Sequence, residues 1–454
     1  MNQLSKLSGI EISTEKEDLI CYSFDASYTE ETIPKAVAWP KNTEEVVRIV
    51  KYANENNYSI IPRGAGTGMV GGSVPYGNCI VISMEKMRKM LDVDTKNLTV
   101  TVEPGIINGK LQAELKYLGF FYPPDPASLN ICTIGGNVAT NAGGPSAIKY
   151  GVTRDYILSI EALMPDGSIV TFGGRTYKRV VGYDLKNILI GSEGTLAIFT
   201  KIRLKILPMP EDVIALLAMF NSIDKAGEAV SKIISSKIIP RAIELMDRFS
   251  IDAVENYRPT GLPSECDGLL LIELDGYPST IKKEAERIID ICRSFGGEVV
   301  LAEDNIARER LWEARRAISP ALYHIKPTKL NEDIVVPRSR VSDILRELRR
   351  LSEESGIRII SFGHAGDGNI HVNIMVDIND KEEFEKGKEL QRKIFEATLR
   401  LGGSISGEHG IGITKAPYIS MEIKEKELQL MKGIKRLFDP KGIFNPGKIY
   451  GKIN

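Results

Sequence analysis

62-PRGAGTGMVGG-72 and 132-CTIGGNVATNAGG-144 are the two stretches from which the fold of this chain can be worked out. Glycine has no side chain to pack, but its backbone adopts positive φ and can lie flush against a ligand with the N–H group as a donor. Successive N–H groups in such loops form concave nests suited to phosphate. The sequence therefore predicts two backbone cradles for a phosphate-bearing ligand.

Two common phosphate motifs do not fit these stretches. Gly66, Gly68 and Gly71 spell a formal G-x-G-x-x-G, which in a dinucleotide-binding fold follows a strand and opens a helix. Residues 57–62 supply a strand, but Gly-Ser-Val-Pro at 72–75 follows where the helix should begin. No Gly-Lys-Ser/Thr closes the loop either. The sequence thus argues against both a Rossmann unit and a P-loop.

Composition is that of an ordinary globular protein. A chain of 454 residues suits two or three domains. With 59 Lys+Arg against 60 Asp+Glu, it has no electrostatic footprint for nucleic acid. We expect no transmembrane segment, because no apolar run approaches about 20 residues. The five cysteines form no C-x-x-C pair, which suits a reducing cytoplasm and excludes a self-contained iron–sulfur cluster site.

The order of expected elements favours an α+β fold. Before Pro210, helix and strand signals intermingle without regular βα alternation. After it, two strand–helix–strand units at 213–247 and 269–304 suggest a ferredoxin-like sheet. Strands are expected at 357–364 and 369–376. The predicted segments are an N-terminal helical segment, a first domain, a second domain, and a C-terminal helix with its tail: 1–33, 34–211, 212–415 and 416–454.

Three of the four histidines fall in 363-GHAGDGNIHVN-373 and 407-GEHGIG-412. The turn between the two expected strands should bring His364 and His371 to one point, and His371 should share a face with Asn373. Adding Glu408 gives the ligand set of a catalytic metal, zinc first and manganese second. His409, beside Glu408, should project differently and serve as a base. The alternatives are structural histidines and a ligand role for Asp367, whose simpler role is bonding the turn backbone.

These motifs resemble those of the FAD-dependent D-2-hydroxyacid dehydrogenases, which include D-lactate dehydrogenases, D-2-hydroxyglutarate dehydrogenase and the glycolate oxidase catalytic subunit. The resemblance covers about residues 20–450. Besides the stretches already quoted, it includes YPPDPAS (122–128), GSEGTLAIFTK (191–201) and DPKGIFNPGK (439–448). It implies a PCMH-type (vanillyl-alcohol-oxidase-like) FAD-binding domain, then a ferredoxin-like α+β cap domain, with the last helix returning to the FAD domain.

The resemblance also implies site residues. FAD contacts are expected at the two glycine stretches and three further motifs: Pro62, Arg63, Gly64, Ala65, Gly66, Thr67, Gly68, Gly71, Pro124, Asp125, Ser128, Thr133, Gly135, Gly136, Asn137, Asn141, Gly144, Glu193 and Asn445. FAD should be non-covalent, because the first loop holds no histidine; a link to Cys132 is the alternative. The family assigns a divalent metal to His364, His371 and Glu408, and the base to His409. Substrate contacts are expected at Arg315, Ser319, Lys329 and Asn373, with Arg316 the weaker alternative to Arg315.

The implied activity is oxidation of a D-2-hydroxyacid, D-lactate before glycolate or D-2-hydroxyglutarate. Electrons would pass to a separate acceptor: an iron–sulfur subunit, an electron-transfer flavoprotein, a cytochrome or a quinone. The protein would be cytoplasmic, or peripheral to a membrane through that partner. A homodimer is one of the oligomeric states compatible with the sequence. Two alternatives are a non-redox transferase resembling alkylglycerone-phosphate synthase and an electron-transfer subunit of a complex. The first would need a run of histidines that this sequence lacks.

Overall fold

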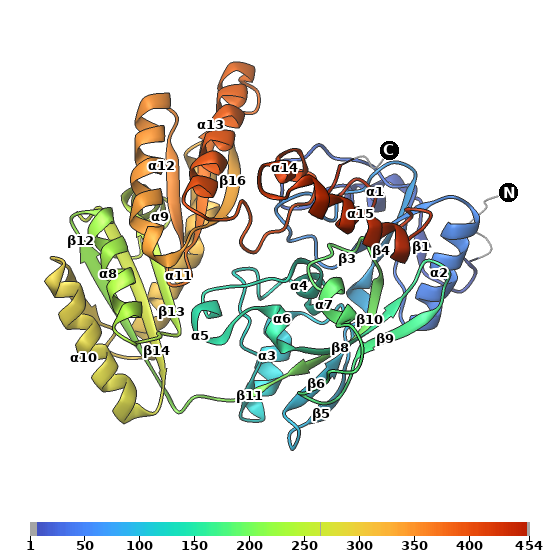
Figure 1. The fold of residues 1–454 in the computed structure, drawn as a ribbon, viewed down its shortest axis with the longest axis horizontal. Coiled ribbons are helices and arrows are strands. Elements are labelled where there is room, and N and C mark those ends of the chain that lie inside the picture. Colours follow the sequence, from blue (N-terminus) through green and yellow to red (C-terminus); the bar gives the residue numbers. More distant parts are fainter. Residues whose placement is uncertain (1–6, 264, 452–454) are drawn as a thin grey trace. The chain divides into compact units, whose positions relative to one another are not determined.

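The computed structural model describes residues 7–263 and 265–451. The chain forms two compact units, each built from separate segments (Figure 1). The first comprises Met1–Ala142, Val152–Met209 and Glu408–Asn454, and the second comprises Gly143–Gly151 and Pro210–Gly407. Compared with the predicted limits, segment 143–151 is grouped with the second unit, and the return to the first unit begins at Glu408.

The first unit contains a small mixed sheet with strand order β1-β2-β4-β3. Strands β2 and β3 pair parallel to β4, whereas β1 pairs antiparallel to β2. Helix α2 (Thr43–Glu55) begins after Asn42, whose side chain accepts from the Glu45 amide and so caps the helix. The helix and the sheet share one apolar core. The strands are β1 (Ile12–Ser13), β2 (Ala36–Ala38), β3 (Ser59–Arg63) and β4 (Cys79–Ser83).

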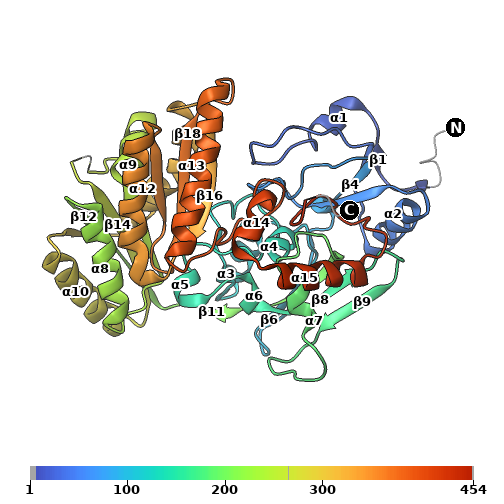
Figure 2. The same ribbon diagram turned by 45° about the horizontal axis from the view of Figure 1, so that its top comes forward.

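The first unit also contains a five-stranded antiparallel sheet with order β5-β6-β10-β8-β9. Around it lie short helices and the last helix of the chain, α15 (Figure 2). The ring centroid of Phe438, the last residue of α15, lies 6.3 Å from that of Phe172 on β9. The elements are β5 (Met90–Asp94), β6 (Thr99–Val102), α3 (Asn108–Tyr117), α4 (Ile134–Thr140), α6 (Thr153–Tyr156), β8 (Ile157–Leu163), β9 (Ile169–Gly173), α7 (Leu185–Leu189), β10 (Ile198–Lys205) and α15 (Glu425–Phe438).

The second unit is built on one antiparallel sheet of order β15-β12-β14-β13-β17-β18-β16. Helices α8, α10, α12 and α13 cover one face, and α9 and α11 cover the other (Figure 1). The strands are β12 (Asp212–Phe220), β13 (Ala242–Asp247), β14 (Gly268–Gly276), β15 (Glu298–Leu301), β16 (Thr328–Val335), β17 (Ile359–His364) and β18 (Asn369–Val376). The helices are α8 (Ile223–Ser235), α9 (Arg248–Tyr257), α10 (Pro278–Ser294), α11 (Asn305–Ala321), α12 (Val341–Ser355) and α13 (Lys381–Arg400).

The α9–α11 face of this sheet is apolar at one end and polar at the other. At the apolar end, Met246, Phe362 and Met375 pack with α9 and α11. Side chains two residues apart share a face of a strand. Glu244, His364, Asn373 and their alternating neighbours therefore point to this same face, where they form a buried polar row. The row comprises Glu244, Glu273, Lys329, Asn331, Asp333, His364, His371 and Asn373.

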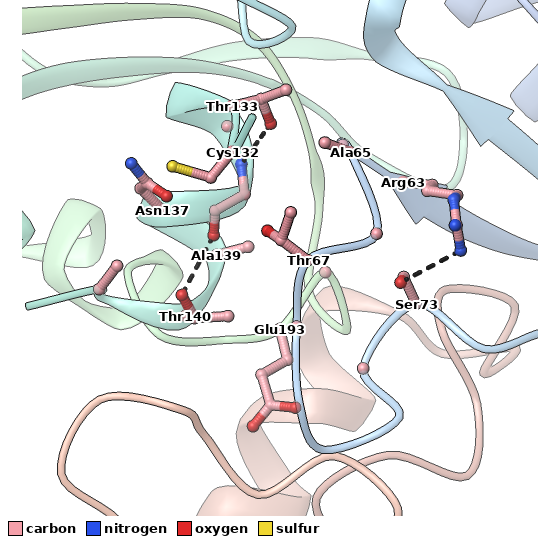
Figure 3. Close-up of a pocket in the computed structure, with 18 of the residues that line it drawn as sticks. Arg63, Ala65, Thr67, Ser73, Cys132, Thr133, Asn137, Ala139, Thr140 and Glu193 are labelled. Atoms are coloured by element: carbon pink, nitrogen blue, oxygen red, sulfur yellow. Dashed lines mark hydrogen bonds between the residues drawn. The ribbon is translucent and has the colours of Figure 1, made fainter. Parts of the chain in front are cut away.

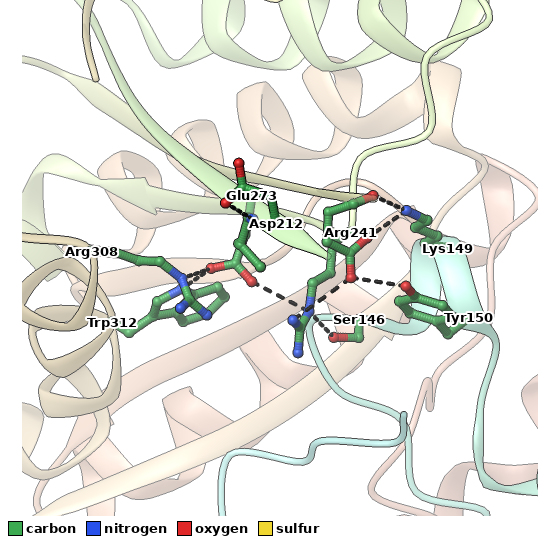
Figure 4. A network of polar contacts seen from close by, with 10 residues as sticks. Ser146, Lys149, Tyr150, Asp212, Arg241, Glu273, Arg308 and Trp312 are labelled. Atoms are coloured by element: carbon green, nitrogen blue, oxygen red, sulfur yellow. Dashed lines mark hydrogen bonds and ion pairs between the residues drawn. The ribbon is translucent and has the colours of Figure 1, made fainter. Parts of the chain in front are cut away.

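The short segment 143–151, with helix α5 (Ala147–Tyr150), is held to the second unit by a buried acidic pair on β14 (Figure 4). Asp275 accepts from Lys149 Nζ and from the Tyr150 hydroxyl, the latter at 2.8 Å. Arg241 lies between Asp275 and Glu273, and its Nε donates to Ser146 Oγ at 3.3 Å. These contacts explain why this segment groups with residues 210–407 rather than with its neighbours in sequence.

The α+β class is confirmed, and most expected strands and helices lie where the sequence predicts them. The structure adds elements that were not predicted, among them strand β5, helix α9, and helix α4 in the second glycine stretch. Among the described residues, no helix has both the length and the apolar character that a membrane crossing requires.

Candidate functional site

The first unit encloses a cavity of about 240 Å³ lined by both glycine stretches (Figure 3). The predicted cofactor residues that line it are Pro62, Arg63, Gly64, Ala65, Gly66, Thr67, Gly68, Ser128, Thr133, Gly135, Gly136, Asn137 and Glu193. Glu408 and His409 line the same cavity. The predicted residues that are not part of this lining are Gly71, Pro124, Asp125, Asn141, Gly144 and Asn445.

The first loop offers a row of backbone donors to this cavity. None of the amide N–H groups of residues 65–70 donates a hydrogen bond to another residue of the described chain. Successive backbone donors without a partner in the chain can all bond one ligand that is rich in acceptors. A pyrophosphate supplies those acceptors, and the loop therefore fits the phosphate part of FAD.

The shape of this loop depends on glycine at specific positions. At Gly66, φ is +69°, and a Cβ would stand 2.2 Å from Arg63 Nη2. The Arg63 guanidinium lies there because Nη1 donates to the Phe24 carbonyl at 2.6 Å and to Ser73 Oγ at 3.4 Å. At Gly64, a Cβ would stand 2.3 Å from Thr133 Oγ1, so the two glycine stretches touch where side chains are absent.

The second stretch is a helix rather than the second open cradle that the sequence suggests. Thr133 caps α4 by accepting from the Gly136 amide at 3.2 Å, and Gly135 N donates to the Pro104 carbonyl at 2.7 Å. The amides of Gly135 and Gly136 are therefore bonded to a neighbouring segment and to the helix cap. What glycine supplies here is a smooth helix surface: Gly135, Gly136 and Ala139 face the cavity without bulky side chains.

Glu193 ties the segment that carries Glu408 and His409 to the cavity wall. Its carboxylate accepts from the amides of Ile411 at 2.7 Å and Gly412 at 2.8 Å. Burial raises the pKa of the Glu193 carboxyl above its ordinary value, while the two amide hydrogen bonds act in the opposite direction. Glu193 is held at φ +52°, and its carbonyl accepts from Asn445 Nδ2 at 2.6 Å.

Of the predicted cofactor residues outside the lining, Pro124, Asn141 and Asn445 have structural partners. The Pro124 carbonyl accepts from Asn108 Nδ2 at 3.0 Å. Asn141 ends helix α4 at φ +55°, and its side chain accepts from the Arg154 amide at 2.9 Å. Gly144 belongs to the second unit. Asn445 Nδ2 donates to the Gly72 carbonyl at 2.9 Å, and this contact stabilises the end of the first glycine stretch.

In the second unit, the 364–371 hairpin brings two imidazoles together, as predicted. Strands β17 and β18 pair antiparallel, and the ring centroids of His364 and His371 lie 5.0 Å apart. Both side chains are buried, and Asp367 Oδ1 accepts from the Asn369 amide at 3.2 Å, the turn role that was expected of it in preference to metal ligation. Two imidazoles this close together could share one metal ion. The third predicted ligand, Glu408, follows the last residue of this unit, Gly407, in the chain.

A buried carboxylate on β13 links His364 to Arg315. Glu244 Oε1 lies 2.6 Å from His364 Nδ1, and Glu244 Oε2 accepts from Arg315 Nε at 2.7 Å. Burial alone would raise the pKa of the Glu244 carboxyl, but His364 and Arg315 together hold it below its ordinary value. The guanidinium of Arg315 also lies over the Phe362 ring, 4.7 Å from its centroid.

Of the other predicted substrate residues, Lys329 and Asn373 lie on the same face of the sheet as Glu244, and Ser319 on α11 contacts that face. Lys329 Nζ donates to Ser319 Oγ at 2.7 Å, and burial lowers the pKa of Lys329 to about 8. Asn373 Oδ1 accepts from Asn331 Nδ2 at 2.7 Å. Arg316, by contrast, is exposed and pairs with Glu309, as expected for a solvated helix face.

Asp333 on β16 fixes the chain just before Glu408. It accepts from Asn369 Nδ2 at 2.6 Å and, through its other oxygen, from the Gly407 amide at 2.9 Å. Motif reading missed both Asp333 and Glu244. The available signal was an acidic residue inside an apolar strand, as in 241-RAIELMD-247, because a carboxylate is rarely buried without partners.

Two family models match the chain: FAD binding domain over residues 34–173 and FAD linked oxidases, C-terminal domain, over residues 209–449. The chain is 41% identical over 454 residues to the glycolate oxidase subunit GlcD of Bacillus subtilis (strain 168), covering 99% of this chain and 96% of that protein. It is 37% identical over 420 residues to a D-lactate dehydrogenase of Archaeoglobus fulgidus, covering 92% and 91%. Among solved structures, p-cresol methylhydroxylase matches with TM-score 0.81 at 15% identity, covering 99% and 96%, which confirms the PCMH-type fold.

Proposed function

Because the chain belongs to the FAD-linked oxidases and is thus an FAD-dependent oxidoreductase, we propose that it oxidises a D-2-hydroxyacid to the 2-oxoacid. Relatives named glycolate oxidase and D-lactate dehydrogenase make D-lactate and glycolate the first candidates, ahead of D-2-hydroxyglutarate. The carrying observation is that Glu408 and His409 line the cavity whose loop offers unpaired amide donors. In this proposal the cavity holds FAD, and His409 is the acid–base side chain beside it.

The bound groups would supply two kinds of chemistry: FAD accepts the hydride, and a divalent metal adds Lewis-acid charge. His409 would accept the proton of the substrate's 2-hydroxyl group, a general-base contribution of roughly 10²–10⁴ in rate. Glu193 would keep His409 in place through the amides of Ile411 and Gly412.

The second unit would bind the carboxylate of the substrate. With Nε of Arg315 engaged by Glu244, its two terminal amino groups remain for a bidentate contact. Lys329 and Asn373 would add a charge and an amide on the same sheet face. His364, His371 and Glu408 would hold the metal, and the position of Glu408 next to the anchored Gly407 supports its inclusion.

We expect FAD to be non-covalent. His409 is a base in this proposal, and the lining cysteine, Cys132, is buried, which raises the pKa of its thiol. A thiol that stays protonated is a poor nucleophile. Acid precipitation should release all flavin into the supernatant. Flavin that stays with the protein would implicate Cys132, and a Cys132→Ser variant would test that link.

The proposed activity can be tested by anaerobic mixing of the FAD-loaded protein with D-lactate, glycolate and D-2-hydroxyglutarate. At least one should bleach the visible flavin absorbance, with the L-enantiomers as matched controls. If dithionite bleaches the flavin but no D-2-hydroxyacid does, the proposal is wrong. The same outcome would favour a non-redox role for the chain.

We further propose that the electrons leave to a separate acceptor. The five cysteines are free and four are buried, so the described chain has no cysteine cluster for an iron–sulfur centre. Flavin reduced by substrate should therefore be reoxidised by an added dye faster than by oxygen. The order of the two rates decides between a dehydrogenase and an oxidase.

A further inference from the structure

We propose that Glu244 is the positioning residue that orients the metal ligand His364 and the substrate-binding Arg315 at the same time. This inference rests on the proposed function, because it concerns how the chain prepares that site. Glu244 is fully buried on β13, and its two carboxylate oxygens each contact a different functional side chain.

The contact with His364 fixes which ring nitrogen faces a metal. An ionised carboxylate can only accept hydrogen bonds, so Nδ1 of His364 carries the hydrogen in the 2.6 Å contact with Oε1. Nε2, on the opposite side of the ring, is then the nitrogen for ligation. A carboxylate behind a ligating imidazole also raises its basicity, and loss of such a partner costs 10- to 100-fold in metal affinity.

The contact with Arg315 fixes the plane of the guanidinium. Nε donates to Glu244 Oε2 at 2.7 Å, and the Phe362 ring lies against one face. Arg315 also belongs to a stripe on α11, with Arg308, Trp312 and Ser319, that meets the polar row of the sheet. Arg308 and Trp312 bond Glu273, and Ser319 bonds Lys329. Glu244 is the member of the row that bonds both this stripe and a histidine of the hairpin.

Glu273 provides a matched control on the neighbouring strand. It is also a buried carboxylate of the same sheet face, and it also accepts from two α11 side chains, Arg308 at 2.6 Å and Trp312 at 2.8 Å (Figure 4). It bonds neither histidine of the hairpin in the described structure. Glu273→Gln should therefore report the cost of losing a buried carboxylate on this face, without loss of the His364 contact.

The test is to measure the zinc dissociation constant of FAD-loaded wild type, Glu244→Gln and Glu273→Gln by competition with a chromophoric chelator. Glu244→Gln should weaken zinc binding 10- to 100-fold and raise KM for the hydroxyacid more than it lowers kcat. Glu273→Gln should stay within about twofold of wild type. Zinc affinity in Glu244→Gln equal to that in Glu273→Gln would overturn the inference.

Two further outcomes separate this inference from the proposed function. A wild type that binds neither zinc nor manganese refutes the proposed metal, and with it the role of Glu244 toward His364. A wild type that binds zinc tightly while Glu244→Gln does the same refutes the positioning role alone. Should Glu244→Gln fold poorly, Glu244→Asp keeps the charge on a shorter arm and should show a smaller loss of zinc affinity.

Discussion

The cavity of the first unit and the polar face of the second unit assemble their functional groups in different ways. The cavity uses backbone amides of residues adjacent in sequence, with glycines where a Cβ would collide. The polar face uses buried side chains that come from five strands and a helix, such as Glu244, Arg315 and His371. A site built from backbone amides appears in the sequence as one contiguous motif. A site on a sheet face appears as single charged residues far apart in the sequence. Substitutions in the two regions should therefore have separable effects.

The largest effect should come from His371→Ala, which removes one of the two hairpin imidazoles. Because metal charge supplies several kcal/mol of stabilisation, activity should fall at least about 10³-fold. FAD content should be unchanged, since the cavity residues belong to the first unit. Elemental analysis and flavin absorbance measure the two losses separately. The matched control is His324→Ala. His324 belongs to the same unit and lies against the Tyr257 ring, and this variant should keep its metal.

If His371→Ala retained full metal, the metal assignment would be wrong. If it lost FAD together with metal, the two regions would not be separable, and the comparison itself would fail.

His409→Asn should have the next largest effect, because it removes the imidazole that lines the cavity and serves as the proposed base. FAD, metal and substrate affinity should stay near wild type, while flavin reduction falls at least about 10²-fold, the low end for a positioned base. Stopped-flow reduction of the metal-loaded variant measures this. A near-normal rate would end the general-base role, and loss of metal instead would make His409 a ligand.

The cavity could largely be predicted from sequence, because its requirements are local. Glycine at Gly64 and Gly66 is needed by the backbone itself, and the Asn42 cap and alternating strands follow similar short-range rules. The 364–371 hairpin was predictable for the same reason. Helix α4 was missed because glycine disfavours helix interiors, and here close contact with Pro104 and the cavity outweighs that preference.

The polar face was only partly predictable, because it depends on strand register. The pairing of Glu244 with His364 across β13 and β17 sets their contact, and the two residues are 120 positions apart. Nothing local in 241–247 shows which strand will lie alongside. Likewise, 143–151 groups with the second unit through Lys149, Tyr150 and Asp275, contacts that span more than 120 residues.

A smaller effect is expected from Gly64→Ala, which tests the backbone cradle. The added methyl would stand 2.3 Å from Thr133 Oγ1 and displace the cap of α4. Loss of such a cap costs about 1 kcal/mol, and the shifted loop should lower FAD affinity at least about tenfold. Metal content should stay the same. Gly433→Ala, a helix position with no atom within 4 Å of the new methyl, is the control. Unchanged FAD affinity would show that the loop tolerates side chains.

The smallest effect, and the one with a distinctive pH signature, should come from Lys329→Met. Burial lowers the pKa of Lys329 to about 8, so its ammonium group is charged at pH 7 and increasingly neutral above pH 8. A charged lysine would attract the substrate carboxylate. In wild type, KM should therefore rise above pH 8, by up to about tenfold per unit. In Lys329→Met, KM should be about tenfold higher at pH 7, with little further rise, while kcat stays close to wild type.

The stability of the folded protein should change with pH in the opposite direction to substrate affinity. Affinity should fall above pH 8, whereas the contribution of Lys329 to stability should rise. The pKa of Lys329 is lower in the folded protein than in the unfolded chain, so between about pH 8 and 10.4 the unfolded chain binds more protons. The contribution of Lys329 to the free energy of unfolding therefore increases as pH rises through this window. Lys329→Met should lack this pH-dependent increase. Lys326→Met, three residues earlier and paired with Glu383 at a more exposed position, is the control for both measurements. If Lys329 only joins β16 to α11 through Ser319, the substitution should change thermal stability and leave KM and its pH dependence as in wild type.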